Sequence, residues 1–258
     1  MRVLITGAAS GIGAAAAAAL RRRGASVVGL DLNEGPGIVV ADVRDQAQVD
    51  AAVERAVREM GGLDVVVNSA GIGEPQNAGL PPDDAAVAIM ETNFFGPWRV
   101  TAAAMPALLR SRGRVVNVAS GLAAISLPYG AAYSASKRAL AAYSDVLRVE
   151  YGGRITVTTV YPGYVNTPIH RPSLARGVQL GRAVPQDSLD AAAGTVVRAC
   201  LGPPRRELAT STLTATGVFI ARHAPALVDA VVRARVRTMA RRGQLGDAHL
   251  GSPAPDDR

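Results

Sequence analysis

The sequence predicts an α/β protein in which a doubly wound parallel sheet of about seven strands carries helices on both faces. Three observations support this fold class. Short apolar runs alternate along the chain with longer helical patterns. These runs are rich in β-branched residues and nearly continuous in hydrophobicity, as strands buried on both faces require. With 258 residues, 48% of them hydrophobic, the chain can also bury one substantial core.

The strands and helices are predicted in alternation, as crossover connections between parallel strands require. Six strands are predicted clearly and one less clearly. The clear strands are residues 2–6, 26–31, 37–41, 64–68, 114–120 and 155–161, and the less clear strand is 207–212. Helical patterns cover residues 12–23, 46–60, 84–110 and 131–151. The alanine run at 14–19 lies on the first helix, where small side chains permit close packing.

The C-terminal third of the chain is less regular. Residues 164–185 contain scattered Pro, Gly and Arg without a period, which is typical of a lid, and we assign them to a main domain of residues 1–215. Residues 216–250 are predicted as a basic helical extension with a helix starting at Pro225, and residues 251–258 as a disordered tail. The apolar side of this amphipathic helix comprises Leu227, Val228, Val231, Val232, Val236 and Met239, and arginines 233, 237, 241 and 242 fall elsewhere.

Composition excludes several classes of protein. One cysteine, Cys200, rules out an intrachain disulfide framework and a cysteine-rich zinc site, and the three histidines lack metal-site spacing, so we expect no metal. The net charge of +7 comes from arginines spread along the chain without a nucleic-acid-binding motif, so we expect no nucleic-acid partner. The chain opens directly into a strand without a secretory signal, and no apolar run is long enough to span a bilayer. We expect a cytoplasmic protein.

A glycine-rich turn follows the first predicted strand. The stretch "LITGAASGIGAAAAAALRRRG" reads as strand, turn and helix, with glycines at positions 7, 11 and 13. Such a turn lets the backbone approach a pyrophosphate closely, and the amides at the helix N-terminus face its negative charge. The sequence therefore predicts a dinucleotide-binding site.

An acidic residue, Asp31, ends the second predicted strand 18 residues after Gly13. A carboxylate there can accept hydrogen bonds from the adenosine ribose hydroxyls and repels a 2′-phosphate. Its neighbours Leu30 and Leu32 carry no positive charge. The sequence thus favours NAD over NADP, although the arginines at 21–23 would weaken that preference if they lay nearby.

Tyr133 and Lys137 lie four residues apart on a predicted helix, so they share a face. Lys137 is the only lysine in the sequence, and all the other residues counted among the 28 lysines and arginines are arginine. An ammonium close to a tyrosine lowers the pKa of the phenol and suits it to exchange a proton with an alcohol or ketone. Arg138 is expected to point off the face that Tyr133 and Lys137 share and to have no specific role. Ser120, at the end of a strand, is expected at the same sheet edge.

Taken together, these residues resemble the short-chain dehydrogenase/reductase family, in its single-domain subgroup of about 250 residues. The resemblance covers roughly residues 1–215. The matching motifs are T-G-x-x-x-G-x-G at 6–13, N-S-A-G at 68–71, Asn93, Ser120, Y-x-x-x-K at 133–137, and P-G at 162–163 followed by Thr167. The second residue of N-S-A-G departs from the usual asparagine. The C-terminal region also lacks the glycine-rich strand on which many members build a tetramer.

The resemblance implies a Rossmann-like fold and a role for each matching residue. Tyr133 would be the acid/base, Lys137 would lower its pKa and hold the nicotinamide ribose, Ser120 would bind the substrate oxygen, and Asn93 would support the active-site helix and a proton relay. Asn68 to Gly71 would brace the sheet and line the cofactor site. The implied cofactor-binding residues are Gly7, Ser10, Gly11, Ile12, Gly13, Asp31, Leu32, Asp42, Val43, Asn68, Ala70, Gly71, Tyr133, Lys137, Pro162, Gly163, Val165 and Thr167.

The expected function is NAD(H)-dependent interconversion of a secondary alcohol and a ketone, on a hydrophobic substrate of lipid, steroid or polyketide-like character. The substrate would meet the 122–130 loop and the lid, with Tyr129, Tyr164 and His170 as polar contacts. An NADPH-dependent ketoreductase is the runner-up. An idle NAD-sensing regulator, a Rossmann-like methyltransferase and a membrane-binding scaffold remain as alternatives. We expect a homodimer or homotetramer, and the basic tail leaves peripheral membrane contact open.

Overall fold

The computed structural model of the chain describes residues 1–177 and 186–241. Its centre is a seven-stranded sheet in the order β3-β2-β1-β4-β5-β6-β7, and all neighbouring strands are parallel. The strands are β1 (Arg2–Thr6), β2 (Ser26–Asp31), β3 (Ile38–Val40), β4 (Val65–Asn68), β5 (Arg114–Val118), β6 (Thr156–Tyr161) and β7 (Glu207–Ala209). The doubly wound parallel sheet that the sequence predicts is therefore confirmed.

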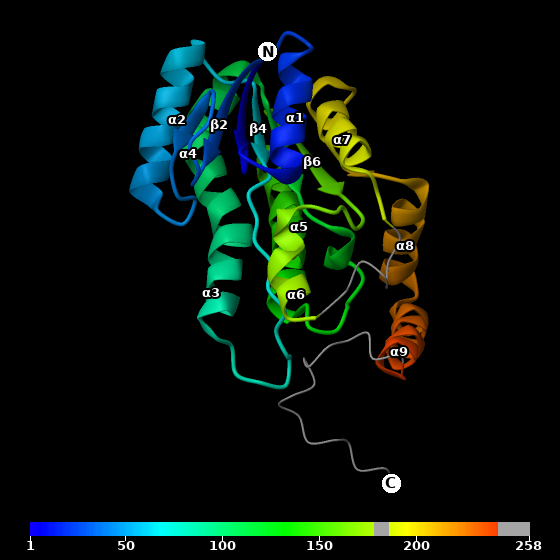
Figure 1. Ribbon diagram of the computed structural model, residues 1–258. Helices are drawn as coiled ribbons and strands as arrows, with labels where there is room; N and C mark the ends of the chain where they lie inside the picture. The colour runs from blue at the N-terminus through cyan, green and yellow to red at the C-terminus, as the bar shows by residue number, and fades with distance from the viewer. Residues whose placement is uncertain (178–185, 242–258) are drawn as a thin grey trace.

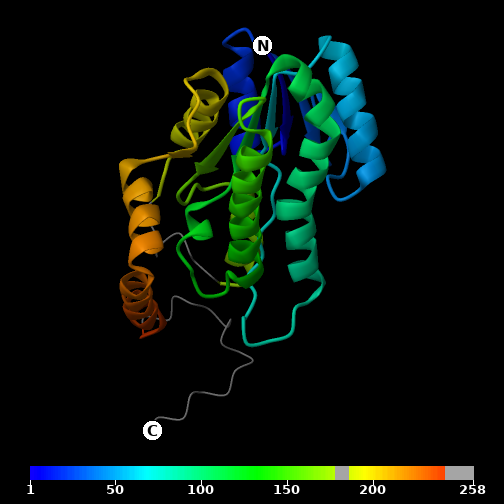
Figure 2. The same cartoon turned by 180° about the vertical axis from the view of Figure 1, so that it is seen from behind.

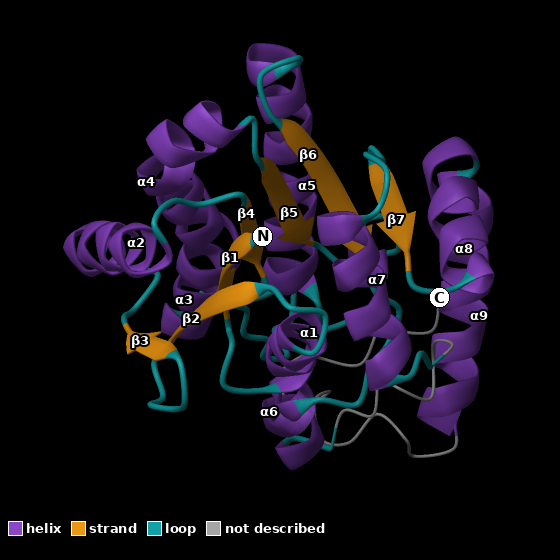
Figure 3. Cartoon of the chain, turned by 90° about the horizontal axis from the view of Figure 1, so that it is seen from above, coloured by secondary structure: helices purple, strands orange, loops and turns teal. Residues whose placement is uncertain are grey.

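Helices cover both faces of this sheet (Figure 3). On one face, α1 (Gly11–Arg21) and α7 (Leu189–Leu201) pack together over a core built largely from alanine and valine. On the other face lie α2 (Gln46–Met60), α4 (Gly96–Ser111) and α5 (Ala131–Tyr151), which the view from behind shows in front of the strands (Figure 2). The small side chains of α1 allow this helix to approach its neighbours closely, as the alanine run predicts.

The remaining elements lie around the carboxyl ends of the strands and beside β7 (Figure 1). They are α3 (Asp84–Met90), a π-helical segment η1 (Glu91–Phe95), the short 3-10 turns η2 (Gly121–Ala123) and η3 (Pro168–His170), α6 (Arg171–Ala175), α8 (Thr212–His223) and α9 (Pro225–Arg241). The domain boundary expected at 215/216 falls inside α8. Of the expected lid, residues 164–177 carry η3 and α6, while 178–185 lie outside the described residues, as do 242–258 with Arg242 and the expected tail.

Two element predictions are wrong in detail. The helix expected over 84–110 is interrupted by η1, because a π turn has no sequence signal that periodicity detects. The strand expected over 207–212 ends at Ala209, because Ser211 caps a helix instead: its hydroxyl accepts a hydrogen bond from the Thr214 amide at 3.2 Å. The sequence also did not predict α7, which Ser188 caps in the same way.

The C-terminal helix α9 starts at Pro225 as expected, but only part of its apolar side is covered. Val228, Val232 and Val236 are half-buried, whereas Leu227 and Val231 are exposed. In the part of the chain that the structure describes, no single helix meets the length and hydropathy needed to cross a membrane. The pair α8 and α9, bent by 117° at their junction, meets that criterion only when the two helices are taken together.

Candidate active site

The glycine turn between β1 and α1 is compressed against its surroundings. A Cβ at Gly13 would lie 2.1 Å from the carbonyl oxygen of Gly7, and a Cβ at Gly7 would lie 2.8 Å from the Cα of Ala70. Gly7 also has a φ of 69°, a conformation that side chains disfavour. The Thr6 hydroxyl accepts hydrogen bonds from the amides of Ser69 and Ala70, which fastens the turn to the segment after β4. The backbone is thus left bare where a pyrophosphate would approach.

A cavity of about 620 Å³ opens beside this turn at the carboxyl ends of the strands. Most of the residues expected to bind cofactor or substrate line it. They are Gly7, Ser10, Gly11, Ile12, Gly13, Asp31, Leu32, Asp42, Val43, Ala70, Gly71, Ser120, Tyr133, Lys137, Pro162, Gly163, Val165 and Thr167. The bare glycine turn at one end and the acid at the end of β2 fit a dinucleotide.

Asp31 is held rigidly at the end of β2. One carboxylate oxygen accepts a hydrogen bond from the Ala9 amide of the glycine turn at 3.0 Å, and the other accepts from the amide and side chain of Asn33. The carboxylate therefore lies between the glycine turn and the neighbouring loop, where the ribose of an adenosine would meet it.

The arginines that could have offset Asp31 lie elsewhere. Arg21 donates to the Val27 carbonyl at the start of β2, and Arg23 donates to the carbonyl of Ala19 within α1. None of the arginines at 21–23 lines the cavity. Among the described residues, the arginine that lines the cavity is Arg44. Its guanidinium is paired with Asp42 at 2.6 Å and lowers the pKa of that carboxyl.

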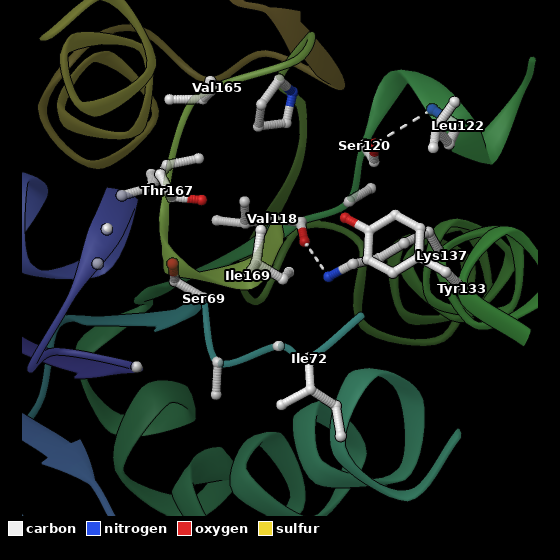
Figure 4. A pocket seen from close by; sticks show the side chains of 18 of the residues that line it. Ser69, Ile72, Val118, Ser120, Leu122, Tyr133, Lys137, Val165, Thr167 and Ile169 are labelled. Atoms are coloured by element: carbon white, nitrogen blue, oxygen red, sulfur yellow. Dashed lines mark hydrogen bonds between the residues drawn. The ribbon is translucent and has the colours of Figure 1, made fainter. Parts of the chain in front are cut away.

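Tyr133, Lys137 and Ser120 meet at the other end of the cavity (Figure 4). The Lys137 side chain is buried, and its Nζ donates to the Val118 carbonyl at 3.0 Å and lies 5.8 Å from the centre of the Tyr133 ring. The Ser120 hydroxyl accepts from the Leu122 amide at 3.1 Å and lies close enough to the Tyr133 phenol to affect the pKa of that phenol. The phenol and the ammonium point into the same space.

Burial, rather than the neighbouring charge, dominates the acidity of this pair. Burial raises the pKa of the Tyr133 phenol, which the nearby Ser120 hydroxyl only partly offsets, and it lowers the pKa of Lys137 to about 8. The Lys137 ammonium donates to the Val118 carbonyl in this structure, and the lowering of the phenol's pKa by Lys137 stays a prediction. At neutral pH the phenol keeps its proton and can act as an acid.

Because Lys137 is the only lysine, its ionisation can be followed directly. Protein labelled with ¹³C at lysine Cε, and carrying no lysine in any added tag, should give one lysine signal by NMR. We expect this signal to titrate with a midpoint near 8, with the ammonium present below that pH and the neutral amine above it. A midpoint near 10.4, the ordinary value for an exposed lysine, would contradict the burial of this side chain.

Asn93 occupies the π segment η1 and is completely buried. Its side-chain oxygen accepts from the Ile72 amide at 2.9 Å, and its Nδ2 donates to the Ile72 carbonyl and to the Ser136 hydroxyl at 3.1 Å. Ser136 is adjacent to Lys137 on α5. Asn93 therefore joins the segment after β4 to the helix that carries Tyr133 and Lys137, as a support of the active-site helix requires.

Asn68 does not line the cavity, unlike the residues that follow it. Its Nδ2 donates to Asn117 on β5 at 2.8 Å and to Thr101 on α4 at 3.0 Å, so it braces the sheet from inside. The structure thus gives no support for the expected cofactor contact of Asn68, because its side chain turns toward α4 while the backbone of Ser69 to Gly71 reaches the cavity. No cluster of three or more His, Cys, Asp or Glu suited to a metal occurs in residues 1–177 and 186–241.

The sequence of residues 1–176 matches the short chain dehydrogenase family. The chain belongs to this family. It is 32% identical over 210 residues to the dehydrogenase/reductase SDR family member 7B of Xenopus laevis, covering 78% of this chain and 65% of that protein. It is 36% identical over 172 residues to a 3-ketodihydrosphingosine reductase of Bacteroides thetaiotaomicron, covering 64% of each chain. The matches thus span just under two thirds of these relatives' lengths.

A solved short-chain dehydrogenase from Burkholderia cenocepacia, crystallised with NADP, superposes with a TM-score of 0.73. The two sequences are 30% identical, and the superposition covers 93% of this chain and 96% of that one. The agreement over nearly the whole length supports the fold of this short-chain dehydrogenase.

The substrate side of the cavity contains a wall that the sequence did not predict. Helix α8 supplies Leu213, Thr214, Thr216, Gly217 and Ile220, opposite Leu122, Ile125 and Leu127 of the loop before α5. Tyr164 and His170 also line the cavity and stack on each other with ring centres 4.2 Å apart. Tyr129, which has a φ of 61°, lines a separate hollow beside α3 instead.

Arg138 has a specific role in this short-chain dehydrogenase, contrary to the expectation from sequence. Its Nε donates to the Ala123 carbonyl and its Nη2 donates to the Ala124 carbonyl, each at 2.9 Å, and Nη2 also reaches Ser126 at 3.2 Å. These contacts use the fork of the guanidinium, which the single ammonium of a lysine cannot reproduce. Arg138 therefore fastens the loop that carries Leu122 and Ile125 to the active-site helix.

Proposed function

We propose that the chain is an NAD(H)-dependent oxidoreductase that interconverts a secondary alcohol and a ketone. The observation that carries this proposal is the placement of the Tyr133 phenol beside Ser120 and the buried Lys137, in the cavity that the glycine turn also borders. A proton donor and a hydroxyl are thereby available to one substrate oxygen at the end of a dinucleotide-shaped site.

Tyr133, Ser120 and Lys137 have separate roles in the proposed reaction. The nicotinamide cofactor, when bound, supplies the hydride for reduction or accepts it in oxidation. In ketone reduction, Tyr133 donates its proton to the carbonyl oxygen while Ser120 holds that oxygen by a hydrogen bond. The Lys137 ammonium then stabilises the phenolate that remains. In alcohol oxidation the same phenolate accepts the hydroxyl proton.

The walls of the cavity favour an apolar substrate. Leu122, Ile125 and Leu127 face the site from the loop before α5, and Leu213 and Ile220 face it from α8. These side chains offer little hydrogen bonding away from the reacting oxygen. The similarity to a reductase of 3-ketodihydrosphingosine, a lipid ketone, agrees with a lipid, steroid or polyketide-like substrate.

NAD is the proposed cofactor because of Asp31. A 2′-phosphate placed there would meet a fixed carboxylate, and Arg44, the arginine that borders the cavity among the described residues, is already paired with Asp42. The runner-up is an NADPH-dependent reductase, since the Burkholderia relative was crystallised with NADP.

The test combines cofactor binding with turnover. We expect NADH to bind at least about tenfold more tightly than NADPH, which corresponds to ~1.4 kcal/mol, and Asp31→Ser to reduce this ratio. A panel of secondary alcohols with NAD, and of the corresponding ketones with NADH, followed by the absorbance of the reduced cofactor, should reveal turnover with apolar members. Equal binding of both cofactors would favour the runner-up, and binding without turnover on any alcohol or ketone would favour an NAD-sensing regulator.

For the assembly and location we propose a homodimer or homotetramer in the cytoplasm, with peripheral contact of α9 to anionic membranes. The support for membrane contact is that exposed Leu227 and Val231 share the helix with Arg233, Arg235 and Arg237. Co-sedimentation with phosphatidylserine vesicles tests the membrane contact, with neutral vesicles as the control, and light scattering tests the assembly. A monomeric mass by light scattering would contradict the proposed assembly, and failure to sediment with either vesicle type would contradict the membrane contact.

A further inference from the structure

Asp187 makes three contacts that join separate parts of the site. It lies just before α7, at the point where the described chain resumes, and it is half-buried. Its Oδ2 accepts a hydrogen bond from the Gly163 amide at 2.9 Å and another from the Thr214 hydroxyl at 3.2 Å. Its own amide donates to the Tyr164 carbonyl at 2.7 Å. One carboxylate oxygen therefore holds the loop after β6 and the first turn of α8 at the same time.

The Asp187 carboxylate and the Thr214 hydroxyl approach Gly163 closely. A Cβ there would lie 2.6 Å from Oδ2 of Asp187 and 2.8 Å from Oγ1 of Thr214. Gly163 does not have a positive φ, so a side chain there would be opposed by the close approach of Asp187 and Thr214, which would have to shift, and not by the backbone conformation. The loop that borders the cofactor side of the cavity is thus shaped around this carboxylate.

The contact with Thr214 leads to the substrate wall. Thr214 lies in the first turn of α8, and its hydroxyl also meets Ser211, the residue that caps this helix, at 3.0 Å. Thr214, Gly217 and Ile220 on the same helix line the cavity. Any displacement of α8 by a substrate therefore acts on the hydrogen bond between Thr214 and Asp187.

We propose that Asp187 is a positioning residue that couples cofactor binding to substrate binding. This inference rests on the proposed function. Asp187 fixes the Pro162–Gly163 backbone for the cofactor, and its Oδ2 links the position of this backbone to that of α8. Binding of the cofactor then favours binding of the substrate, and the reverse, because both ligands order the Asp187 carboxylate. Such coupling is reciprocal, so cofactor should improve substrate affinity by the factor by which substrate improves cofactor affinity.

The test is a double-mutant cycle of Asp187→Ala and Thr214→Val. NADH affinity is measured by fluorescence titration, and substrate KM by turnover with the best ketone of the panel. Asp187→Ala should weaken NADH binding about tenfold, the loss expected for a hydrogen bond to a charged group. Thr214→Val should leave NADH affinity near wild type, since the Gly163 contact remains, and raise the substrate KM severalfold. In the Asp187→Ala background, Thr214→Val should have little further effect.

Two further variants keep the test decisive. Asp187→Asn retains an acceptor oxygen and should restore most of the NADH affinity, which a loss of folding would not allow. Asp190→Ala removes an exposed acid three residues away and serves as the charge-matched control. Additive effects of the two substitutions, or unchanged NADH affinity in Asp187→Ala, would overturn the coupling. Failure of the wild-type chain to bind either dinucleotide would instead overturn the proposed function, so the two failures are distinguishable.

Discussion

Replacement of Tyr133 by phenylalanine should reduce turnover by at least about a hundredfold, the range expected for lost acid/base catalysis. The phenol can give a proton to the substrate oxygen, because it stays protonated in its buried position beside Ser120. The substitution removes one oxygen and leaves the ring in place, so NADH binding should stay near the wild-type value. Steady-state turnover and fluorescence titration of NADH measure the two quantities separately.

Tyr143 provides the matched control for this substitution. It lies on the same helix α5, but it stacks on Trp98 away from the cavity, with ring centres 5.1 Å apart. Tyr143→Phe makes the same chemical change and should preserve turnover. If Tyr133→Phe kept wild-type turnover, or if both variants lost it equally, a role of Tyr133 in proton transfer would be ruled out.

Replacement of Lys137 by arginine should remove most of the activity although it keeps the charge. The ammonium is buried, donates to Val118, and lies 3.4 Å from where a Cβ of Gly71 would stand, so the surroundings leave little room for a wider guanidinium. We expect turnover to fall by at least about tenfold, equivalent to ~1.4 kcal/mol of transition-state stabilisation. Thermal unfolding of the variant shows whether the fold is intact.

Position 138, next to Lys137, allows the reverse substitution of lysine for arginine. Arg138→Lys should raise the substrate KM, because the three hydrogen bonds to the 123–126 loop are lost, and should affect turnover at saturation less than Lys137→Arg does. If Lys137→Arg had near-normal turnover, the chemical explanation for a lysine at this position would fail. Equal losses in turnover from both exchanges would point to disruption of α5 instead.

Much of the fold and of the cofactor side could be predicted from local signals. The glycine turn, the acid at the end of β2 and the strand-end Ser120 are each encoded within a few residues, and parallel strands bring their carboxyl ends to one edge. Most of the expected residues therefore line one cavity. Asn68 is the exception among the cofactor contacts, since the direction of a side chain at the last residue of a strand depends on register.

The features that sequence did not reveal depend on contacts between distant segments. The pairing of Asp187 with Gly163 and Thr214 joins residues 24 and 27 positions apart. The role of Arg138 depends on where the 121–126 loop folds. The start of α8 is not predicted, because the β-branched residues around Thr212 resemble a strand. The acidity of Tyr133 and Lys137 depends on burial, which spacing along a helix does not report.

The transfer of deuterium from cofactor to product tests the central claim most directly. NADH carrying deuterium at the transferable C4 position is incubated with the best ketone of the panel, and the alcohol is analysed by mass spectrometry and NMR. We predict that wild type places the deuterium on the carbinol carbon and that Tyr133→Phe forms little of this product. Alcohol without deuterium at that carbon, or equal labelled product from both proteins, would contradict hydride transfer with Tyr133 as the proton donor.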